Sequence, residues 1–518
     1  MSIQKSLQEQ FVIKFLKIKM SSDLIIQDRD TINYIRILKV FICIGILAAI
    51  VNYIYNRSLW TDEAMISTNI INKNYRDLLR PLDMNQVAPI GFLLIEKTLV
   101  NLFGNNDWVL RIFPLVSYFL SIFIFYKLSF LLFNSSKLSA TACCIFSLNV
   151  LLIYFSSEVK QYSSDVLMSL TIFYFTFYVD KIRSKKSLTI LAAVGVAAIW
   201  ISNIGIVILF VSCSYLLYLR FVKQKGFNKA IFIPIVVWMI TFLIYYSLFI
   251  YNHPSKSYMI IYWSNSGSFL PNNVLTADFY KFIYFKIGLI FNYMFRFRTY
   301  WHFGLLFFII GLISAIKNKN RFVLLIFPIV IHFCLSAIKL YPFDTRLILY
   351  QIPLFIIFFV KGLFVAYDFI DKQIIRIPVY LILLPAFLNI YSVIKQTPYQ
   401  RQEVKKSLDY INSQIKVGES IYVYRKGIVA FNFYADKYKN IQNSRIIYGA
   451  WKKTNMDSLN ADVAKIQNNT WILFSNVYEM NEWSDEKYFI DVLLSKGFNI
   501  IDTRKFVGSS CYQVTINK

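Results

Sequence analysis

Long apolar blocks, separated by short polar stretches, run through the first three quarters of the chain. Each block holds roughly 15–25 residues, and a helix of that length crosses a hydrocarbon core of about 30 Å. The pattern predicts an all-α polytopic membrane protein with about eleven spans. The expected spans are 34–54, 108–132, 138–155, 164–180, 188–202, 204–221, 230–251, 301–316, 322–338, 347–366 and 377–394.

Polar and apolar positions alternate differently at the two ends of the chain. Residues 1–33 are mixed and charged, and FVIKFLKIKM (11–20) has the pattern of an amphipathic helix at the membrane interface. Residues 395–518 contain short strand-like and helix-like runs, which predict a small α/β domain outside the membrane. The elements expected there are helix 403–415, strand 420–425, strand 470–475, helix 484–498 and strand 507–516.

The composition agrees with a membrane protein. Hydrophobic residues make up 57% of the 518 residues and charged residues only 16%, whereas a soluble protein has about 25% charged residues. The net charge is +26, and residues 1–394 hold most of it, with 37 Lys and Arg against 17 Asp and Glu. We expect this surplus to contact anionic lipid headgroups. Nucleic-acid binding is not expected, because the sequence has no compact basic domain or recognition motif.

Basic loops predict the orientation of the spans. DKIRSKK (180–186), RFVKQKGFNK (220–229) and KNKNR (317–321) fall on one side of the membrane, together with the N-terminus. The positive-inside rule makes that side cytoplasmic, and an odd number of spans then places the C-terminus on the outer side. The long loops 55–107 and 252–300 are expected outside. Within the second, the apolar run 283–295 is expected to form a juxtamembrane or re-entrant helix.

Acidic and basic side chains gather at the outer ends of the spans. Ionisable groups at membrane depth are candidates for a functional site, because they are costly there. Simpler interpretations are a helix cap for the acids, a snorkelling lysine, and an arginine paired with its neighbouring aspartate. The groups are Asp62 and Glu63 in WTDEA (60–64), Glu158, Lys160 and Asp165 in YFSSEVKQYSSDVL (154–167), and Asp344 and Arg346 in LYPFDTRLILY (340–350).

Several of these stretches together resemble a known family. WTDEA, then NQVAPIGFLLIEK and LFGNNDWVLRIFPLVSYFLSIFIFYKL, then YFSSEVKQYSSDVL resemble, in order and spacing, the polyprenyl-phosphate-sugar-dependent glycosyltransferases of the GT-C fold. The bacterial branch related to dolichyl-phosphate-mannose protein mannosyltransferases and to lipid A aminoarabinose transferase looks similar. YPFDTRLILYQIPL and the tail stretches IYVYRKGIVAFNFYA and WILFSNVYEMNEWSDE also look like that branch. The chain departs from it at Val87-Ala88-Pro89, where many relatives have His-Pro-Pro.

The resemblance implies a GT-C-like membrane domain over 34–394 and a defined chemistry. The reaction would be an inverting transfer of a monosaccharide from a polyprenyl phosphate to an acceptor hydroxyl, at the outer face of a bacterial inner membrane. Asp62 would be the general base, and Glu63 would orient the site or bind the acceptor. The remaining candidates are Glu158 or Asp165 as a second acid, Lys160, Arg346, Arg111 and Arg296 as cations for the donor phosphate, and Gln86 and Pro89 as residues that shape the substrate site.

A metal cofactor and two other functions are alternatives to parts of this hypothesis. Some GT-C enzymes hold a divalent cation with outer-loop acids, but Lys160 beside those acids favours a site with no required metal. The cysteines show no CxxC or Cys/His spacing, so neither a disulfide nor a zinc site is expected. A transporter or flippase of lipid-linked sugars would place ionisable residues near the middle of the spans. A non-catalytic envelope scaffold would tolerate the loss of Asp62. The sequence does not identify the sugar or the acceptor, which could be a glycan, a lipid or a protein.

Overall fold

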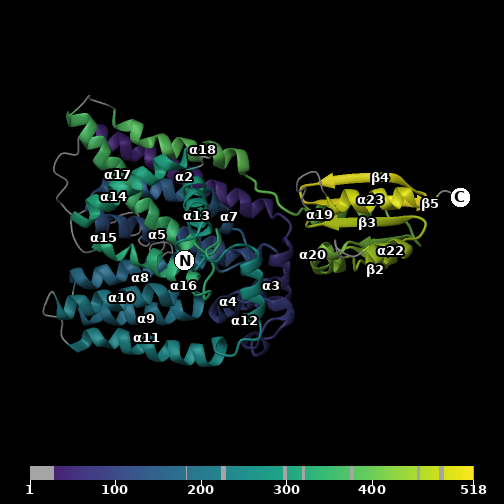
Figure 1. Ribbon diagram of the computed structural model, residues 1–518, viewed down its shortest axis with the longest axis horizontal. Coiled ribbons are helices and arrows are strands. Elements are labelled where there is room, and N and C mark those ends of the chain that lie inside the picture. Colours follow the sequence, from purple (N-terminus) through teal and green to yellow (C-terminus); the bar gives the residue numbers. More distant parts are fainter. Residues whose placement is uncertain are drawn as a thin grey trace, which may run out of the picture.

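The protein consists of a bundle of long helices and a smaller α/β domain at one end of it (Figure 1). The computed structural model describes residues 29–182, 184–222, 229–295, 300–317, 321–373, 378–451, 456–477 and 484–516. The bundle helices are α2 (Arg29–Tyr55), α5 (Ile112–Phe133), α6 (Ser136–Ser147), α7 (Val150–Phe155), α8 (Tyr162–Ile182), α9 (Lys185–Ile201), α10 (Gly205–Phe221), α11 (Phe232–Tyr245), α14 (Trp301–Lys317), α15 (Arg321–Leu324), α16 (Phe327–Ala337), α17 (Ile352–Gln373) and α18 (Leu384–Gln396).

Many of these helices are suited to a membrane. The helical segments that are long and apolar enough to cross it are Ile32–Tyr55, Val109–Phe133, Lys229–Ile250, Leu349–Lys372 and Val379–Gln396. Shorter apolar helices cover Gly205–Phe221, Trp301–Ile316 and Arg321–Ala337. A helix lies in every expected span. The expected all-α polytopic membrane fold with a small C-terminal α/β domain is confirmed. The interfacial helix expected at 11–20 lies outside the described residues.

Two expected spans are interrupted in the structure. The run 138–155 is divided into α6 and α7, because Asn149 caps α7 by accepting hydrogen bonds from the amides of Leu151 and Leu152, both at 3.1 Å. The run 322–338 is divided into α15 and α16, and Pro328 stands in the first turn of α16. Proline suits that position, since its missing N–H would have no partner there.

Glycine allows the closest helix contact in the bundle core. α14 and α17 cross at Gly311 and Gly362, where a Cβ on either glycine would lie 1.8 Å from a backbone carbonyl oxygen of the other helix. Small residues let two helix backbones approach closely in a membrane and gain van der Waals contact. Any larger side chain at Gly311 or Gly362 must push the two helices apart.

A group of shorter helices covers the end of the bundle nearest the α/β domain. α3 (Thr61–Asn72), α4 (Ile90–Phe103) and α12 (Lys256–Asn265) lie there (Figure 1). α13 (Ala277–Phe295) contains the apolar run 283–295, and its last turn packs on α18, where Asn389 donates a hydrogen bond to the carbonyl of Met294 at 3.1 Å. The motifs predicted for the outer loops are therefore built on helices next to the α/β domain.

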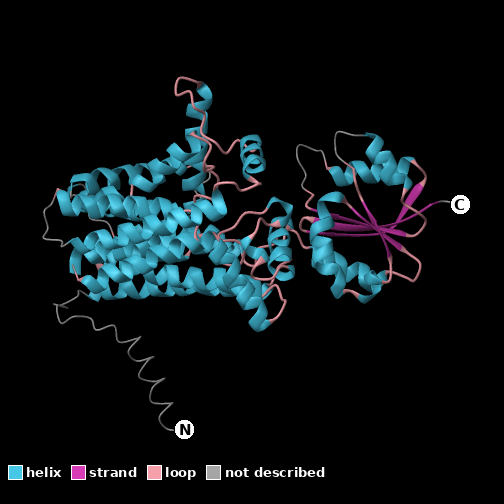
Figure 2. Ribbon diagram, turned by 90° about the horizontal axis from the view of Figure 1, so that it is seen from below, coloured by secondary structure: helices cyan, strands magenta, loops and turns pink. Residues whose placement is uncertain are grey.

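The α/β domain is a five-stranded sheet with helices on both faces (Figure 2). Its strand order is β2-β1-β3-β5-β4, with β1 parallel to β2 and β3, and β5 antiparallel to β3 and β4. The strands are β1 (Ser420–Val423), β2 (Arg445–Tyr448), β3 (Thr470–Ser475), β4 (Phe498–Phe506) and β5 (Ser509–Ile516), and the helices are α19 (Val404–Gln414), α20 (Ile428–Tyr434), α21 (Lys439–Gln442), α22 (Met456–Ala464) and α23 (Asp485–Ser495).

Sequence patterns located the inner strands of this sheet and missed the outer ones. β1, β3 and β5 fall at the expected places, and β1 and β3 are completely buried. β2 and β4 were not expected; they are the two edge strands, and most of their residues are exposed or half-buried. An edge strand needs little apolar surface, so its sequence does not show a buried run or a clear alternation.

Candidate functional site

The WTDEA motif begins α3 directly after a sharp change of chain direction. α2 ends at Tyr55, Asn56 adopts a left-handed conformation with a φ of 49°, and α3 starts at Thr61. Successive side chains on a helix point about 100° apart. As a result, the side chain of Asp62 is 23% exposed, whereas that of Glu63 has no exposed surface. The acidic pair separates into one accessible carboxylate and one core carboxylate.

Asp62 lies between two cations from distant parts of the chain. Lys160 Nζ is 3.2 Å from Asp62 Oδ1, and Arg346 Nη1 is 2.8 Å from Oδ2. Lys160 also donates a hydrogen bond to Gln86 Oε1 at 2.8 Å. Arg346 stacks on Trp263 of α12, with its Cζ 5.0 Å from the ring centroid. Asp62, Lys160, Arg346 and Gln86, four of the predicted site residues, therefore lie together.

The partner of Arg346 differs from the simplest expectation. A local ion pair with Asp344 was the alternative to a site role, but the hydrogen bond of Arg346 goes to Asp62, 284 residues away in sequence. Asp344 instead accepts a hydrogen bond from Ser268 Oγ at 3.4 Å. Arg346 thereby joins the start of α17 to the start of α3.

The charge state of Asp62 follows from its two partners. Burial raises the pKa of the Asp62 carboxyl, but Lys160 and Arg346 outweigh that effect and lower the pKa below its ordinary value. Asp62 is therefore ionised at neutral pH. An accessible carboxylate held between two cations can exchange one of those ion pairs for contact with a ligand.

Glu63 occupies a different position from the one expected. Its carboxylate accepts from Arg57 Nη1 at 2.6 Å and from the amide of Val159 at 2.9 Å, and it pairs with Arg111 Nη2 at 3.4 Å. Because Glu63 is completely buried, binding of an acceptor by Glu63 is incompatible with this arrangement, whereas an orienting role is compatible with it. Although burial opposes ionisation, Arg57 and Arg111 lower the pKa of Glu63.

Arg111 also lies in surroundings that differ from the expected ones. It was expected to contact the donor phosphate, but its side chain is completely buried and bonded to protein groups. Its Nη1 donates to Asn56 Oδ1 at 3.0 Å and to the carbonyl of Arg57 at 2.8 Å. These bonds fix the turn between α2 and α3. Arg111 therefore supports the segment that leads to Asp62 and does not face a phosphate.

Replacement of Glu63 by glutamine should destabilise the protein more than any surface substitution. Removing one partner of a buried ion pair costs about 3–5 kcal/mol, because the remaining charge stays buried. In Glu63→Gln, Arg57 and Arg111 would lose their counter-charge, so we expect a clear fall in the thermal unfolding temperature in detergent. Asp83→Asn is the matched control, since the Asp83 side chain is 70% exposed. Equal unfolding temperatures for the two variants would contradict a buried ion cluster around Glu63.

The two candidates for the second acid occupy different surroundings. Glu158 is buried, and its Oε2 lies 3.6 Å from Arg57 Nη2. Burial and the neighbouring charge of Glu63 raise its pKa. Asp165 instead accepts a hydrogen bond from Ser202 Oγ at 2.5 Å, which ties α8 to the end of α9. Glu158 thus belongs to the ion cluster behind Asp62, and Asp165 holds two membrane helices together.

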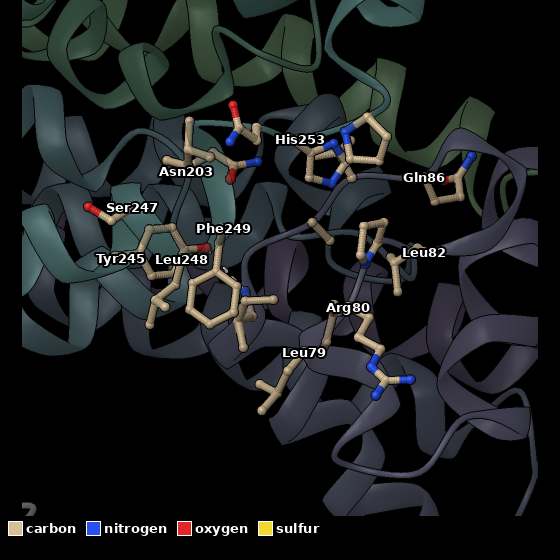
Figure 3. A pocket seen from close by; sticks show the side chains of 18 residues that line it. Leu79, Arg80, Leu82, Gln86, Asn203, Tyr245, Ser247, Leu248, Phe249 and His253 are labelled. Carbon is tan, nitrogen blue, oxygen red and sulfur yellow. Dashed lines mark hydrogen bonds between the residues drawn. The ribbon is translucent and has the colours of Figure 1, made fainter.

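Gln86, which accepts the hydrogen bond of Lys160, also lines a cavity of about 150 Å³ (Figure 3). The cavity lies between the start of α4, which Pro89 initiates as its N-cap, and the π-helical turn Tyr246–Ile250 at the end of α11. His253 and Arg80 are among its polar lining residues. Gln86 lines this cavity, and Pro89 is not among the described residues that line it. Arg296, the remaining predicted cation, lies outside the described residues.

Several residues of the site carried no predicted role. Arg57 links Glu63 to Glu158, and Trp263 supports Arg346. Arg401 and Gln402, between α18 and α19, contact the residues that precede Asp62. No local pattern marks them, because each acts through a contact to a segment far away in sequence.

The carboxylates do not fit a divalent cation. Among the described residues, no group of three or more His, Cys, Asp or Glu side chains is placed to hold a metal ion. Each oxygen of Asp62 already faces a cationic nitrogen, and Glu63 and Glu158 are buried beside Arg57. A divalent cation needs several oxygen ligands directed at one point, and positive side chains stand in those directions here.

Comparisons with known proteins identify the fold. No protein-family model and no curated protein matches the chain significantly. Among solved structures, ArnT from Cupriavidus metallidurans bound to undecaprenyl phosphate is similar, with 10% identity and a TM-score of 0.52 over 92% of this chain and 97% of ArnT. The same protein in the apo state gives 10% identity and a TM-score of 0.54 over 92% and 98%.

An oligosaccharyltransferase from Archaeoglobus fulgidus is more distant, with 13% identity and a TM-score of 0.49 over 84% of this chain and 67% of that one. The likeness to ArnT extends over both the helical bundle and the α/β domain, since it covers nearly the whole length of each chain. At this level of identity it shows a common architecture. The chain therefore has the GT-C fold that its sequence resembles.

Proposed function

We propose that the protein is an inverting glycosyltransferase that moves a monosaccharide from a polyprenyl-phosphate donor to an acceptor hydroxyl at the outer face of a bacterial inner membrane. One observation supports this most directly. A partly exposed carboxylate, Asp62, lies between Lys160 and Arg346 at the end of the membrane helices. The common fold with ArnT, whose structure contains undecaprenyl phosphate, supports a donor of that class.

The reaction needs a base on one side of the sugar and positive charge on the other. Asp62 takes the proton of the acceptor hydroxyl while the oxygen attacks the anomeric carbon. The bond between that carbon and the phosphate oxygen breaks, and the polyprenyl phosphate leaves with the bonding electron pair. Lys160 and Arg346 stabilise the negative charge that develops on the leaving phosphate. Attack opposite the leaving group inverts the configuration of the sugar.

The donor phosphate also changes the basicity of Asp62 in this scheme. Before the donor binds, both cations contact the carboxylate and lower its pKa, so it is a weak base. The donor is a phosphodiester with one negative charge and two unesterified oxygens, so it competes with the carboxylate for the same cations. The second negative charge, which develops as the bond to the sugar breaks, strengthens this attraction. Lys160 and Arg346 then turn towards the phosphate, and the pKa of Asp62 rises. The base becomes active when the donor is in place.

A membrane-fraction assay with radiolabelled polyprenyl-phosphate sugars tests this function. We expect the label to pass to an acceptor and free polyprenyl phosphate to accumulate. A protein that moves intact lipid-linked sugars between leaflets, without bond cleavage, would refute glycosyl transfer and favour the flippase alternative. A protein without any effect on such donors would favour an envelope scaffold.

Chelation of divalent cations should leave the activity unchanged. The cations beside Asp62 are protein side chains, and in the part of the chain that the structure describes no three acids are placed to hold a metal ion. We therefore expect the same initial rate in EDTA as in buffer with added Mg²⁺ or Mn²⁺. Loss of activity in EDTA, followed by recovery with Mn²⁺, would show a metal requirement and overturn this expectation.

A further inference from the structure

The α/β domain contacts the two residues that directly precede Asp62. Gln402 Oε1 accepts hydrogen bonds from the amide of Thr61 at 3.0 Å and from its hydroxyl at 3.2 Å. The guanidinium of Arg401 lies on the ring of Trp60, with Cζ 3.5 Å from the centroid. Thr61 is the first residue of α3, so its amide has no partner within the helix. Gln402 supplies that partner from a separate domain.

Arg401 and Gln402 are themselves held firmly by the sheet. Gln402 is buried, and its Nε2 donates to Oδ1 of Asn476, the residue after β3, at 2.7 Å. Gly508, in the turn between β4 and β5, has a φ of 66°, and a Cβ there would lie 2.2 Å from the carbonyl oxygen of Arg401. The turn therefore requires glycine, and it packs directly against the Arg401 backbone.

The contact with Trp60 extends to the cation that binds Asp62. The Cζ atom of Arg346 lies 5.9 Å from the ring centroid of Trp60 and 5.0 Å from that of Trp263. Arg401, Trp60, Arg346 and Trp263 thus form a series of alternating cations and aromatic rings. Stacking of this kind restricts a guanidinium to a plane, which a single ion pair does not do. The α/β domain therefore influences the orientation of Arg346 as well as that of α3.

A second set of contacts anchors the start of the same segment. Tyr434 of α20 accepts a hydrogen bond from the amide of Leu59 at 2.8 Å and donates to Asp107 at 2.7 Å. Lys405 pairs with Asp107 at 3.1 Å, and its amide donates to Ser58 Oγ at 3.0 Å. Ser58 and Leu59, between α2 and α3, are therefore also bonded to the α/β domain.

We propose that Arg401 and Gln402 are positioning residues, which hold Trp60 and Thr61 and thereby set the Asp62 carboxylate between Lys160 and Arg346. The proposal rests on the proposed function, because it assigns a catalytic purpose to this contact. A reacting group displaced by about 1 Å can lose about 10²-fold in rate. Without Gln402 the first turn of α3 loses its amide partner, and Asp62 stands on that turn.

Gln402→Leu, Gln402→Glu and Arg401→Lys test this role. Gln402→Glu keeps the oxygen that accepts from Thr61, whereas Gln402→Leu removes it. Arg401→Lys keeps the charge but loses the planar stack on Trp60. Gln467→Leu is the matched control, because Gln467 lies in the same domain and bonds to the exposed Arg445. Each variant is studied as the full-length membrane protein.

Kinetics and hydrogen exchange are both measured. We expect kcat of Gln402→Leu to fall about 10- to 100-fold with little change in the donor KM, and that of Arg401→Lys to fall less. The acid limb of the pH–rate profile of Gln402→Leu should move to higher pH, because Asp62 would lose part of its contact with the two cations. Amide exchange of the peptide containing Thr61 should become faster in Gln402→Leu. Gln402→Glu keeps the acceptor for Thr61 but loses the donor to Asn476, so its kcat should lie between those of Gln402→Leu and wild type. Gln467→Leu should behave like wild type.

The outcomes separate this proposal from the proposed function. Faster exchange at Thr61 with unchanged kcat and pH profile would make the contact merely structural and overturn the positioning role. Unchanged exchange in Gln402→Leu would overturn it as well. If Gln402→Leu does not fold, amide exchange will be faster throughout the α/β domain. Arg401→Lys is then the variant that tests the proposal. Normal kinetics and normal exchange in Arg401→Lys would reject it. An inactive wild type would refute the proposed function, and with it the catalytic purpose of this contact.

Discussion

Replacement of Asp62 by asparagine should reduce kcat by about 10²- to 10⁴-fold, the usual contribution of a general base. Asparagine has the same shape, and its amide cannot take a proton from the acceptor hydroxyl. The donor KM should not rise, because Lys160 and Arg346 lose their carboxylate partner and become freer to bind phosphate. The membrane-fraction assay, with expression matched by immunoblot, measures both quantities.

The pH dependence of the wild-type enzyme gives a second test of Asp62. A base must be ionised to act, and the pKa of Asp62 in the free protein is below its ordinary value. The acid limb of kcat/KM should therefore lie at a pH lower than an unperturbed aspartate would give. The limb of kcat, which reports the donor complex, should lie at higher pH if the phosphate draws the cations away.

Asp83→Asn is the control for Asp62→Asn, since Asp83 lies in the same outer segment and pairs with Lys73 at the surface. It should retain normal turnover. If Asp62→Asn also turns over at the wild-type rate, Asp62 serves only to stabilise the start of α3. The other two acids of the sequence analysis, Glu158 and Asp165, would then be the remaining candidates, and because both are buried, a rearrangement would have to expose them before they could contact an acceptor.

Removal of either cation beside Asp62 should have the second-largest effect. Loss of one group that stabilises a developing anion costs about 10²- to 10³-fold in kcat, and we expect that range for Lys160→Ala and for Arg346→Ala. Arg346→Lys should recover only part of the rate. Lysine keeps the charge, but it lacks the planar group that stacks on Trp263.

Product inhibition and pH dependence show whether these cations bind the phosphate. Free polyprenyl phosphate should inhibit Lys160→Ala and Arg346→Ala more weakly than wild type. The acid limb of kcat/KM should move to higher pH in both variants, because Asp62 loses one of the two cations that lower its pKa. Lys73→Ala is the control, as Lys73 pairs with the exposed Asp83. Unchanged inhibition in both site variants would exclude them from the phosphate site.

The helical architecture was predictable because the hydrocarbon core acts on each span separately. A block of apolar residues must form a helix in lipid whatever its neighbours are. The interruptions at Asn149 and Pro328 have equally local causes, a side chain that caps a helix and a residue that favours the first turn. Length and local chemistry were therefore enough for most of the membrane domain.

The α/β domain was predictable only in part. Its buried strands β1 and β3 have continuous apolar sequences. The edge strands β2 and β4 form because neighbouring strands offer them hydrogen bonds. Most of their side chains are exposed or half-buried, so their sequences contain no buried apolar run. A strand stabilised mainly by its neighbour cannot be recognised from its own residues.

The sequence by itself determined that this protein is a polytopic membrane protein with acids and cations near the ends of its spans. The tertiary structure decided which of them form a site. It placed Asp62 between Lys160 and Arg346, and it buried Glu63 and Arg111, which the sequence also offered as site candidates. The physical reason is that burial and charge pairing depend on contacts between segments up to 284 residues apart, about which a local pattern contains no information.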